Sequence, residues 1–138
     1  MPGWRELTAV AAGGVIGTGL RLGLDTVIPH SDTGFPLSTL LVNILGSFAL
    51  GAFVATLWRR ASTPNWLKVG LGTGLVGSFT TFSSLIVSLV AEAQHGLWML
   101  AVLYLMLSLI LGFGAALLGL SVGRRPRPTP LEVETERE

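Results

Sequence analysis

Residues 70–84 have the sequence GLGTGLVGSFTTFSS, and the architecture of the chain follows from this segment. It lies inside a run without charged side chains that is long enough to cross a membrane. Its glycine and hydroxyl residues are too dense for a regular spanning helix, so they predict a helix that is broken at mid-membrane. Broken backbone is tolerated at this depth only where protein or a cavity covers it. The carbonyl groups freed by such a break would suit a small, hard cation.

The composition of the whole chain also indicates a membrane protein. The chain has 138 residues, of which 50% are hydrophobic and only 12% are charged, and its mean hydropathy is +0.66. Soluble domains carry about 25% charged residues. We therefore exclude a nucleic-acid binder, a disordered protein and an ordinary cytosolic enzyme. The absence of cysteine excludes a disulfide framework, a thiolate metal site and a cysteine nucleophile.

Hydropathy divides the chain into four spans and a tail. Residues 5–27, 37–58, 67–91 and 97–122 are expected to be transmembrane helices, which gives an all-α membrane domain over residues 1–123. The first span is the weakest because Arg21 and Asp25 interrupt it, but it has no clear signal-peptide cleavage site. Residues 124–138 mix proline, arginine and glutamate, and they are expected to form a disordered, charged cytoplasmic tail.

The basic residues are distributed unevenly between the two ends of the predicted spans. Those near the N-terminus, in the second connection and at the start of the tail would all lie on one side, whereas the first and third connections contain no lysine or arginine. The residues of this set are Arg5, Arg59, Arg60, Lys68, Arg124, Arg125 and Arg127. The positive-inside rule predicts a multi-pass protein of the inner (plasma) membrane with both termini in the cytoplasm.

Polar side chains inside the spans are the candidate functional residues. Asn43 and the hydroxyl groups of residues 78–84 supply more hydrogen bonds than helix packing needs, although the neighbouring glycines are explained by packing alone. Arg21 is expected to face a wet vestibule, where it would attract anions. No cluster of His, Cys, Asp or Glu has metal-ligand spacing and no nucleophile has a neighbouring base, so we expect no enzyme. The acidic residues Glu6, Asp25 and Glu92 are expected near membrane edges.

Three motifs in this order resemble the Fluc family of fluoride channels. They are GGVIG at 13–17 with Arg21, STLLVNILGSF at 38–48, and GSFTTFSS at 77–84. The likeness covers nearly all four spans and leaves out only the tail. It implies an antiparallel, dual-topology dimer of four-helix subunits with two fluoride pores. It also implies a structural sodium ion at the dimer centre, which is not transported and is held by backbone carbonyls of Gly77 and Thr80.

The resemblance also assigns roles in the pore. Asn43 would donate its amide hydrogen to fluoride, and Phe82 would face the anion with the positive edge of its ring. Without the resemblance, Phe82 would be explained better by packing. The other residues that match the family pattern are Ser83, Ser84, Tyr104 and Ser108 in the pore and Arg21 in a vestibule.

Two features depart from the family pattern. The second phenylalanine of the third motif is replaced by Leu85, which removes one aromatic anion contact. The one-sided basic residues do not suit a homodimer that inserts in both orientations. The partner is therefore either a second copy of the chain or a paralogous subunit of opposite orientation.

The function that follows is a fluoride-selective channel that lowers cytoplasmic fluoride, and so confers fluoride resistance, by passive efflux. Two alternatives stay open. A small drug-proton antiporter has a similar architecture, but it requires a carboxylate inside the membrane. A non-conducting partner subunit of a heterodimeric channel would explain the glycines and leave Asn43 and Arg21 without a role.

Overall fold

The computed structural model describes residues 3–28 and 34–123. Within these ranges the chain is helical and contains no strand. The predicted tail over 124–138, with Arg124, Arg125 and Arg127, lies outside the described residues. The elements are α1 (Trp4–Val27), α2 (Leu37–Phe53), η1 (Val54–Trp58), α3 (Asn65–Val69), η2 (Gly70–Val76), α4 (Gly77–Phe79), α5 (Ser83–Gln94) and α6 (Trp98–Val122).

These elements form four long apolar helical segments in the described part of the chain. Each is long and apolar enough to cross a membrane: Trp4–Val27, Leu37–Trp58, Asn65–Gln94 and Trp98–Val122. The all-helical architecture with four spans is therefore confirmed. Large apolar side chains such as Val15, Ile110 and Phe113 point outward, as expected for surfaces that face lipid tails instead of water.

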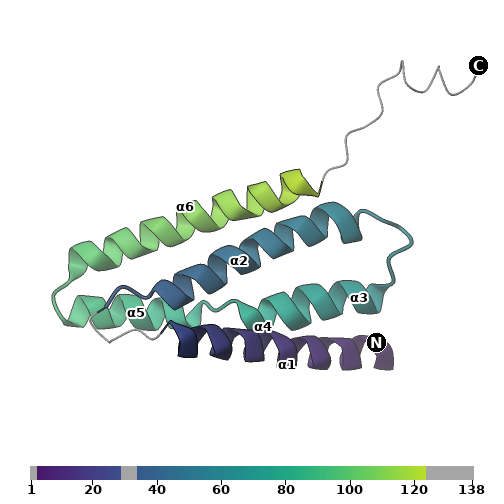
Figure 1. Ribbon diagram of the computed structural model, residues 1–138, viewed down its shortest axis with the longest axis horizontal. Coiled ribbons are helices and arrows are strands. Elements are labelled where there is room, and N and C mark those ends of the chain that lie inside the picture. Colours follow the sequence, from purple (N-terminus) through teal and green to yellow (C-terminus); the bar gives the residue numbers. More distant parts are fainter. Residues whose placement is uncertain (1–2, 29–33, 124–138) are drawn as a thin grey trace, which may run out of the picture.

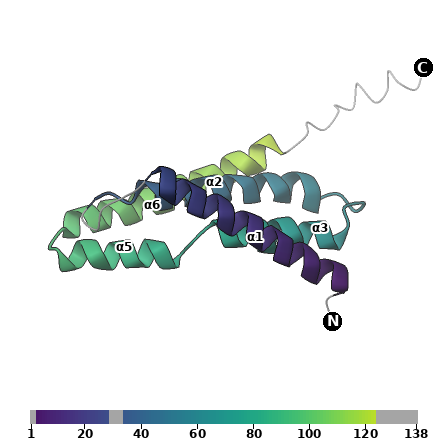
Figure 2. The ribbon, with the colours of Figure 1, turned by 60° about the horizontal axis from the view of Figure 1, so that its bottom comes forward.

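The segments lie alongside one another and alternate in direction (Figures 1 and 2). The start of α1, the connection after η1 and the end of α6 share one end of the bundle, and the turn between α5 and α6 lies at the other. The described basic residues at the first end are Arg5, Arg59, Arg60 and Lys68. The structure thus gathers these charges as the sequence predicted, while the side of the membrane they face stays a prediction.

Close backbone contact joins α1 to η2 and α2 to α6, which are the most extensively packed pairs. A Cβ atom added at Gly17 would collide with the Leu75 carbonyl oxygen and lie 3.0 Å from the Phe79 nitrogen. On α6, a Cβ atom at Gly119 would collide with the Phe48 carbonyl oxygen. Small residues are therefore required at these positions, since helices in lipid associate by direct packing of their backbones.

Where α2, α5 and α6 meet, the bundle encloses its main apolar cluster. Leu40, Leu85 and Tyr104 are its buried members. The ring of Phe35, just before α2, meets the Tyr104 ring edge to face at a centroid distance of 5.5 Å. This cluster holds α5 against α2 and α6, while α4 and η2 pack on α1. The two halves of the third span consequently rest on different neighbours.

We predict that Gly17→Ala destabilises the folded protein. The methyl group has no space against the Leu75 and Phe79 backbone, and overpacking of this kind costs about 1–3 kcal/mol. Thermal unfolding of the purified protein in detergent measures the effect.

Gly19→Ala is the matched control on the same helix. A Cβ atom there meets nothing within 4 Å, so this variant should be as stable as the parent or gain up to about 1 kcal/mol of helix propensity. Equal unfolding temperatures for the two variants would contradict the packing of α1 on η2.

Candidate functional site

Helical structure in the third span stops after Phe79 and resumes at Ser83. Thr80 is extended, with φ −74° and ψ 158°. Its amide nitrogen and its hydroxyl group both donate to the Val76 carbonyl oxygen, at 3.0 and 2.9 Å. These two bonds close the last turn of α4 and direct the chain out of the helix.

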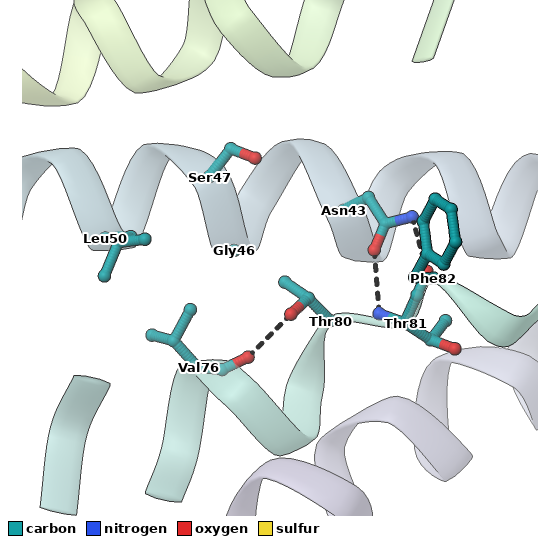
Figure 3. Close-up of a pocket in the computed structure, with 8 residues that line it drawn as sticks. All are labelled: Asn43, Gly46, Ser47, Leu50, Val76, Thr80, Thr81 and Phe82. Carbon is teal, nitrogen blue, oxygen red and sulfur yellow. Dashed lines mark hydrogen bonds between the residues drawn. The ribbon is translucent and has the colours of Figure 1, made fainter. Parts of the chain in front are cut away.

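Asn43 of α2 binds the backbone at this interruption with both atoms of its side-chain amide. Its Nδ2 donates to the Thr81 carbonyl oxygen at 2.9 Å, and its Oδ1 accepts from the Thr81 N–H at 2.9 Å (Figure 3). The pair satisfies backbone groups that the interruption leaves without helical partners. Because the amide has two N–H donors, one of them stays available once the other is bound to Thr81.

The Thr81 hydroxyl group connects the interruption to the first turn of α5. Its oxygen lies 3.1 Å from the Ser83 hydroxyl and 3.2 Å from the Ser84 hydroxyl, and it accepts the Ser84 N–H at 3.2 Å. A threonine hydroxyl that accepts a free N–H near a helix start stabilises that start. The cluster of hydroxyl residues predicted from the sequence is thus partly a structural cap.

Two pockets flank the interruption. The first, of about 260 Å³, contains Asn43 and the interruption itself, and the second, of about 220 Å³, is lined mainly by hydroxyl groups and one carboxylate. The first is lined by Asn43, Gly46, Ser47, Leu50, Val76, Thr80, Thr81 and Phe82 (Figure 3), and the second by Asp25, Thr39, Ser83, Ser84, Val87 and Ser88. Because Thr81 lines the first pocket and hydrogen-bonds residues of the second, it links the two walls.

Phe82 and Leu85 have opposite environments. The Phe82 side chain borders the first pocket next to Asn43, and 76% of the residue is exposed. It is therefore not a packing residue of the isolated chain. Leu85 is buried at 7% exposure in the cluster with Leu40 and Tyr104. The residue that replaces the family's second phenylalanine thus belongs to the packed core of this subunit.

Tyr104 and Ser108 of α6 lie at a second polar cluster. Tyr104 is fully buried, close to the side chains of Ser108, Thr39 and Glu92. No described group meets full hydrogen-bond geometry with the Tyr104 or Ser108 hydroxyl, although Ser108 and Thr39 lie near enough to interact with Tyr104. Thr39 lies one turn before Asn43 on α2 and also lines the second pocket. The structure therefore brings Tyr104 and Ser108 beside the hydroxyl-lined pocket.

Glu92 has an environment that the sequence analysis did not predict. We expected it near a membrane edge, and it does lie in the last turns of α5, close to the end of the third span. Its side chain is nevertheless enclosed between helices and only 1% exposed. The reason is its helical position: Leu85, Leu89 and Glu92 follow one another at steps of four and three and share the face that packs on α2 and α6. The spacing to Leu85 was the sequence signal that could have revealed its burial.

Arg21 lies in the second half of α1 and is partly exposed. It makes no hydrogen bond or ion pair with any other described residue, and it lines neither of the two pockets. The structure therefore leaves its guanidinium group free to interact with solvent, without bringing it to Asn43.

The backbone carbonyls at Gly77 and Thr80 are free in the way that a cation site requires. In a continuous helix the Thr81 N–H would donate to the Gly77 carbonyl, but here it donates to Asn43. No described donor replaces it there, and none reaches the Thr80 carbonyl. Carbonyl oxygens without donors are suitable ligands for a hard cation such as sodium, so these residues fit such an ion.

Comparison with known proteins places the chain in a family. A family profile described as CrcB-like protein, Camphor Resistance (CrcB), matches residues 8–120. A protein of Geobacillus kaustophilus named fluoride-specific ion channel FluC 2 is 41% identical over 120 residues, which cover 86% of this chain and 93% of the relative. FluC 2 of Halalkalibacterium halodurans is 43% identical over 83% of each chain, and FluC 1 of Mycobacterium tuberculosis is 37% identical over 90% of this chain and 94% of its own.

The profile match begins within α1, ends in the last turn of α6, and includes both pockets and the interruption of the third span. The sequence motifs that resemble the fluoride channels therefore lie within a relationship that covers the whole helical bundle. The chain is a multi-pass membrane protein that belongs to the CrcB-like family.

Proposed function

We propose that this protein is a subunit of a fluoride-selective channel that lowers cytoplasmic fluoride by passive efflux. The relatives are named fluoride-specific ion channels, and none of those reported above is named as an enzyme. The observation that carries the proposal is the position of Asn43. Its amide is fixed by Thr81 on one side and shares a pocket with the exposed Phe82 ring on the other.

The chemistry of this pocket suits fluoride. The ion is small and holds its water tightly, so a selective path must replace water with close hydrogen-bond donors. The bond to Thr81 fixes which side of the Asn43 amide carries nitrogen and leaves one N–H for the anion. The hydrogen-rich edge of the Phe82 ring is the positive part of its quadrupole and provides a second favourable contact.

The second pocket continues the path toward the α5–α6 end of the bundle. Ser83 and Ser84 line it, and Tyr104 and Ser108 lie beside it with hydroxyl groups that meet full hydrogen-bond geometry with no described group. We assign these four residues to the fluoride path. Arg21, partly exposed on α1, would raise the local concentration of anions in a vestibule.

We also infer that the interruption of the third span lies at mid-membrane and holds a structural sodium ion. The carbonyl groups of Gly77 and Thr80 would ligate it, because neither accepts a hydrogen bond from a described donor. The ion would provide a partner for carbonyl oxygens that lipid tails cannot hydrogen-bond. In this proposal it is bound permanently and is not transported.

The proposed assembly is an antiparallel dimer. In the single chain the Phe82 ring is largely exposed and both pockets are open to the surface, so a second subunit is needed to enclose a path without lipid. The basic residues at one end of the bundle favour a single orientation, with both termini in the cytoplasm. The partner is a second copy or an oppositely oriented paralogue.

The buried position of Glu92 favours one alternative function, a drug-proton antiporter. Such a mechanism needs a carboxylate shielded from water, and Glu92 is a buried one. A channel would release fluoride without any drug or proton gradient, whereas an antiporter would not. A non-conducting partner subunit, the other alternative, would give no efflux until a paralogue is added.

We predict that Asn43→Asp abolishes fluoride efflux from liposomes that contain the purified protein. The aspartate cannot donate to the Thr81 carbonyl, and its charge opposes an anion by about 4 kcal/mol at 4 Å in a partly polar site. This corresponds to a loss of more than about a hundredfold. A fluoride electrode measures the efflux, with chloride as the test of selectivity.

Asn65→Asp is the matched control, because Asn65 is exposed at the start of α3 and borders neither pocket. This variant should conduct like the parent. Efflux through Asn43→Asp at the parent rate would remove Asn43 from the path, and chloride efflux equal to fluoride efflux would refute selectivity.

Sodium removal should lower the thermal stability of the protein. An ion that binds only the folded state contributes about 2.7 kcal/mol at a hundred times its dissociation constant. We therefore expect a lower unfolding temperature in potassium or N-methylglucamine than in sodium at equal ionic strength. Identical unfolding temperatures in all three salts would count against the sodium site.

The orientation is tested by reporters fused to the C-terminus of the chain expressed alone. We expect activity only from the reporter that functions in the cytoplasm, because all basic residues of the helix ends face one side. Equal activity from cytoplasmic and external reporters would show dual insertion and support a homodimer.

A further inference from the structure

Glu92 is the buried ionisable group that the proposed path does not use. It lies in the last turns of α5 and is 1% exposed. Among the described residues, neither of its carboxylate oxygens has a hydrogen-bond partner. An ionised carboxylate without partners is among the most costly groups to bury, whereas its neutral acid form is far cheaper.

No charged group near Glu92 offsets its charge in the described structure. The elements that pack on α5 are α6 and α2, and within their bounds neither contains Asp, Glu, Lys, Arg or His. Tyr104 is the one titratable residue of α6. His95, just beyond α5, is exposed and uses its Nδ1 for the Ala91 carbonyl oxygen at 2.8 Å. The surroundings therefore favour a Glu92 that carries a proton.

A protonated Glu92 would complete a set of hydrogen-bond donors. The hydroxyl groups of Tyr104 and Ser108 are buried and meet full hydrogen-bond geometry with no described group, and Tyr104 lies close to Glu92. The neutral acid adds a third O–H group, whereas the ionised form is an acceptor only. Each of these three O–H groups can turn toward a small anion and donate to it, whereas a carboxylate in the same place would repel the anion.

We propose that Glu92 is a proton-binding residue of the fluoride path, and that the loss of its proton stops anion passage at the α5–α6 end of the bundle. The inference rests on the proposed channel function. Protonation is a reversible transfer between the carboxyl group and water, and it requires no other reactant. Fluoride efflux should consequently fall as the pH rises.

The test is fluoride efflux from liposomes that contain the full chain, from mildly acidic to mildly alkaline pH. The leak of hydrogen fluoride through protein-free liposomes is subtracted at each pH. Efflux should fall by up to about tenfold per pH unit once Glu92 is mostly ionised. Glu92→Gln keeps a neutral donor and should remove this dependence, with efflux close to the acidic limit at every pH.

The Asp25 carboxylate lines the second pocket and is a further titrating group of the proposed path, so Asp25→Asn is tested first and should keep the pH dependence of the parent. Two more matched variants control for titrating groups outside the pocket. Glu6→Gln removes a carboxylate at the opposite end of the bundle, and His95→Gln removes the imidazole just beyond α5. Both should retain the pH dependence of the parent. Loss of the dependence in His95→Gln would assign it to the histidine and overturn the inference.

Infrared spectroscopy of the folded protein gives a readout that does not depend on flux. A protonated carboxyl band that Glu92→Gln removes is expected at neutral pH, and a carboxylate band in its place would overturn the inference. Efflux that is independent of pH would refute the gating role and leave the channel intact. The absence of efflux at every pH would instead refute the proposed function.

Discussion

Two hydrogen bonds between Asn43 and the backbone of Thr81 hold the third span in its interrupted shape. A helix that stops inside an apolar span exposes N–H and carbonyl groups that lipid cannot satisfy. Asn43 supplies one acceptor and one donor at the same position, as a neighbouring peptide group would. The same exchange withdraws the Thr81 N–H from Gly77, so the bond that stabilises the interruption also frees a carbonyl for a cation.

The glycines determine how this interruption is positioned. Gly13 and Gly17 allow α1 to lie directly on the backbone of η2 and α4, and Gly51 and Gly119 do the same for α2 and α6. The part of the third span before the interruption is thus held by α1, and α5 is held by α2 and α6. Polar groups gather where these two arrangements meet, which explains why both pockets border residues 80–84.

The sequence predicted the four spans because each is a long apolar run, and the density of glycine and hydroxyl residues marked the stretch where helical structure stops.

The sequence could not predict the partner of Asn43, since Thr81 is 38 residues away and helical periodicity does not specify which backbone group meets a side chain. The exposure of Phe82 could not be predicted from its residue type, because an aromatic residue in a span is normally packed, and only the resemblance to the fluoride channels suggested a position in the pore. The burial of Glu92 could have been predicted from its spacing to Leu85 on the face of α5 that packs on α2 and α6. The roles of the pore residues and the sodium site stay predictions.

The Asn43–Thr81 pair is tested most directly by hydrogen exchange of single amides, resolved by NMR in lipid nanodiscs. We expect the Thr81 amide to exchange as slowly as amides inside α5, although it lies outside a helix. The Phe82 amide, which has no described acceptor, should exchange fast. In Asn43→Ala the Thr81 amide should become as fast as that of Phe82. Slow exchange of Thr81 that persists in Asn43→Ala, or fast exchange in the parent protein, would contradict the account.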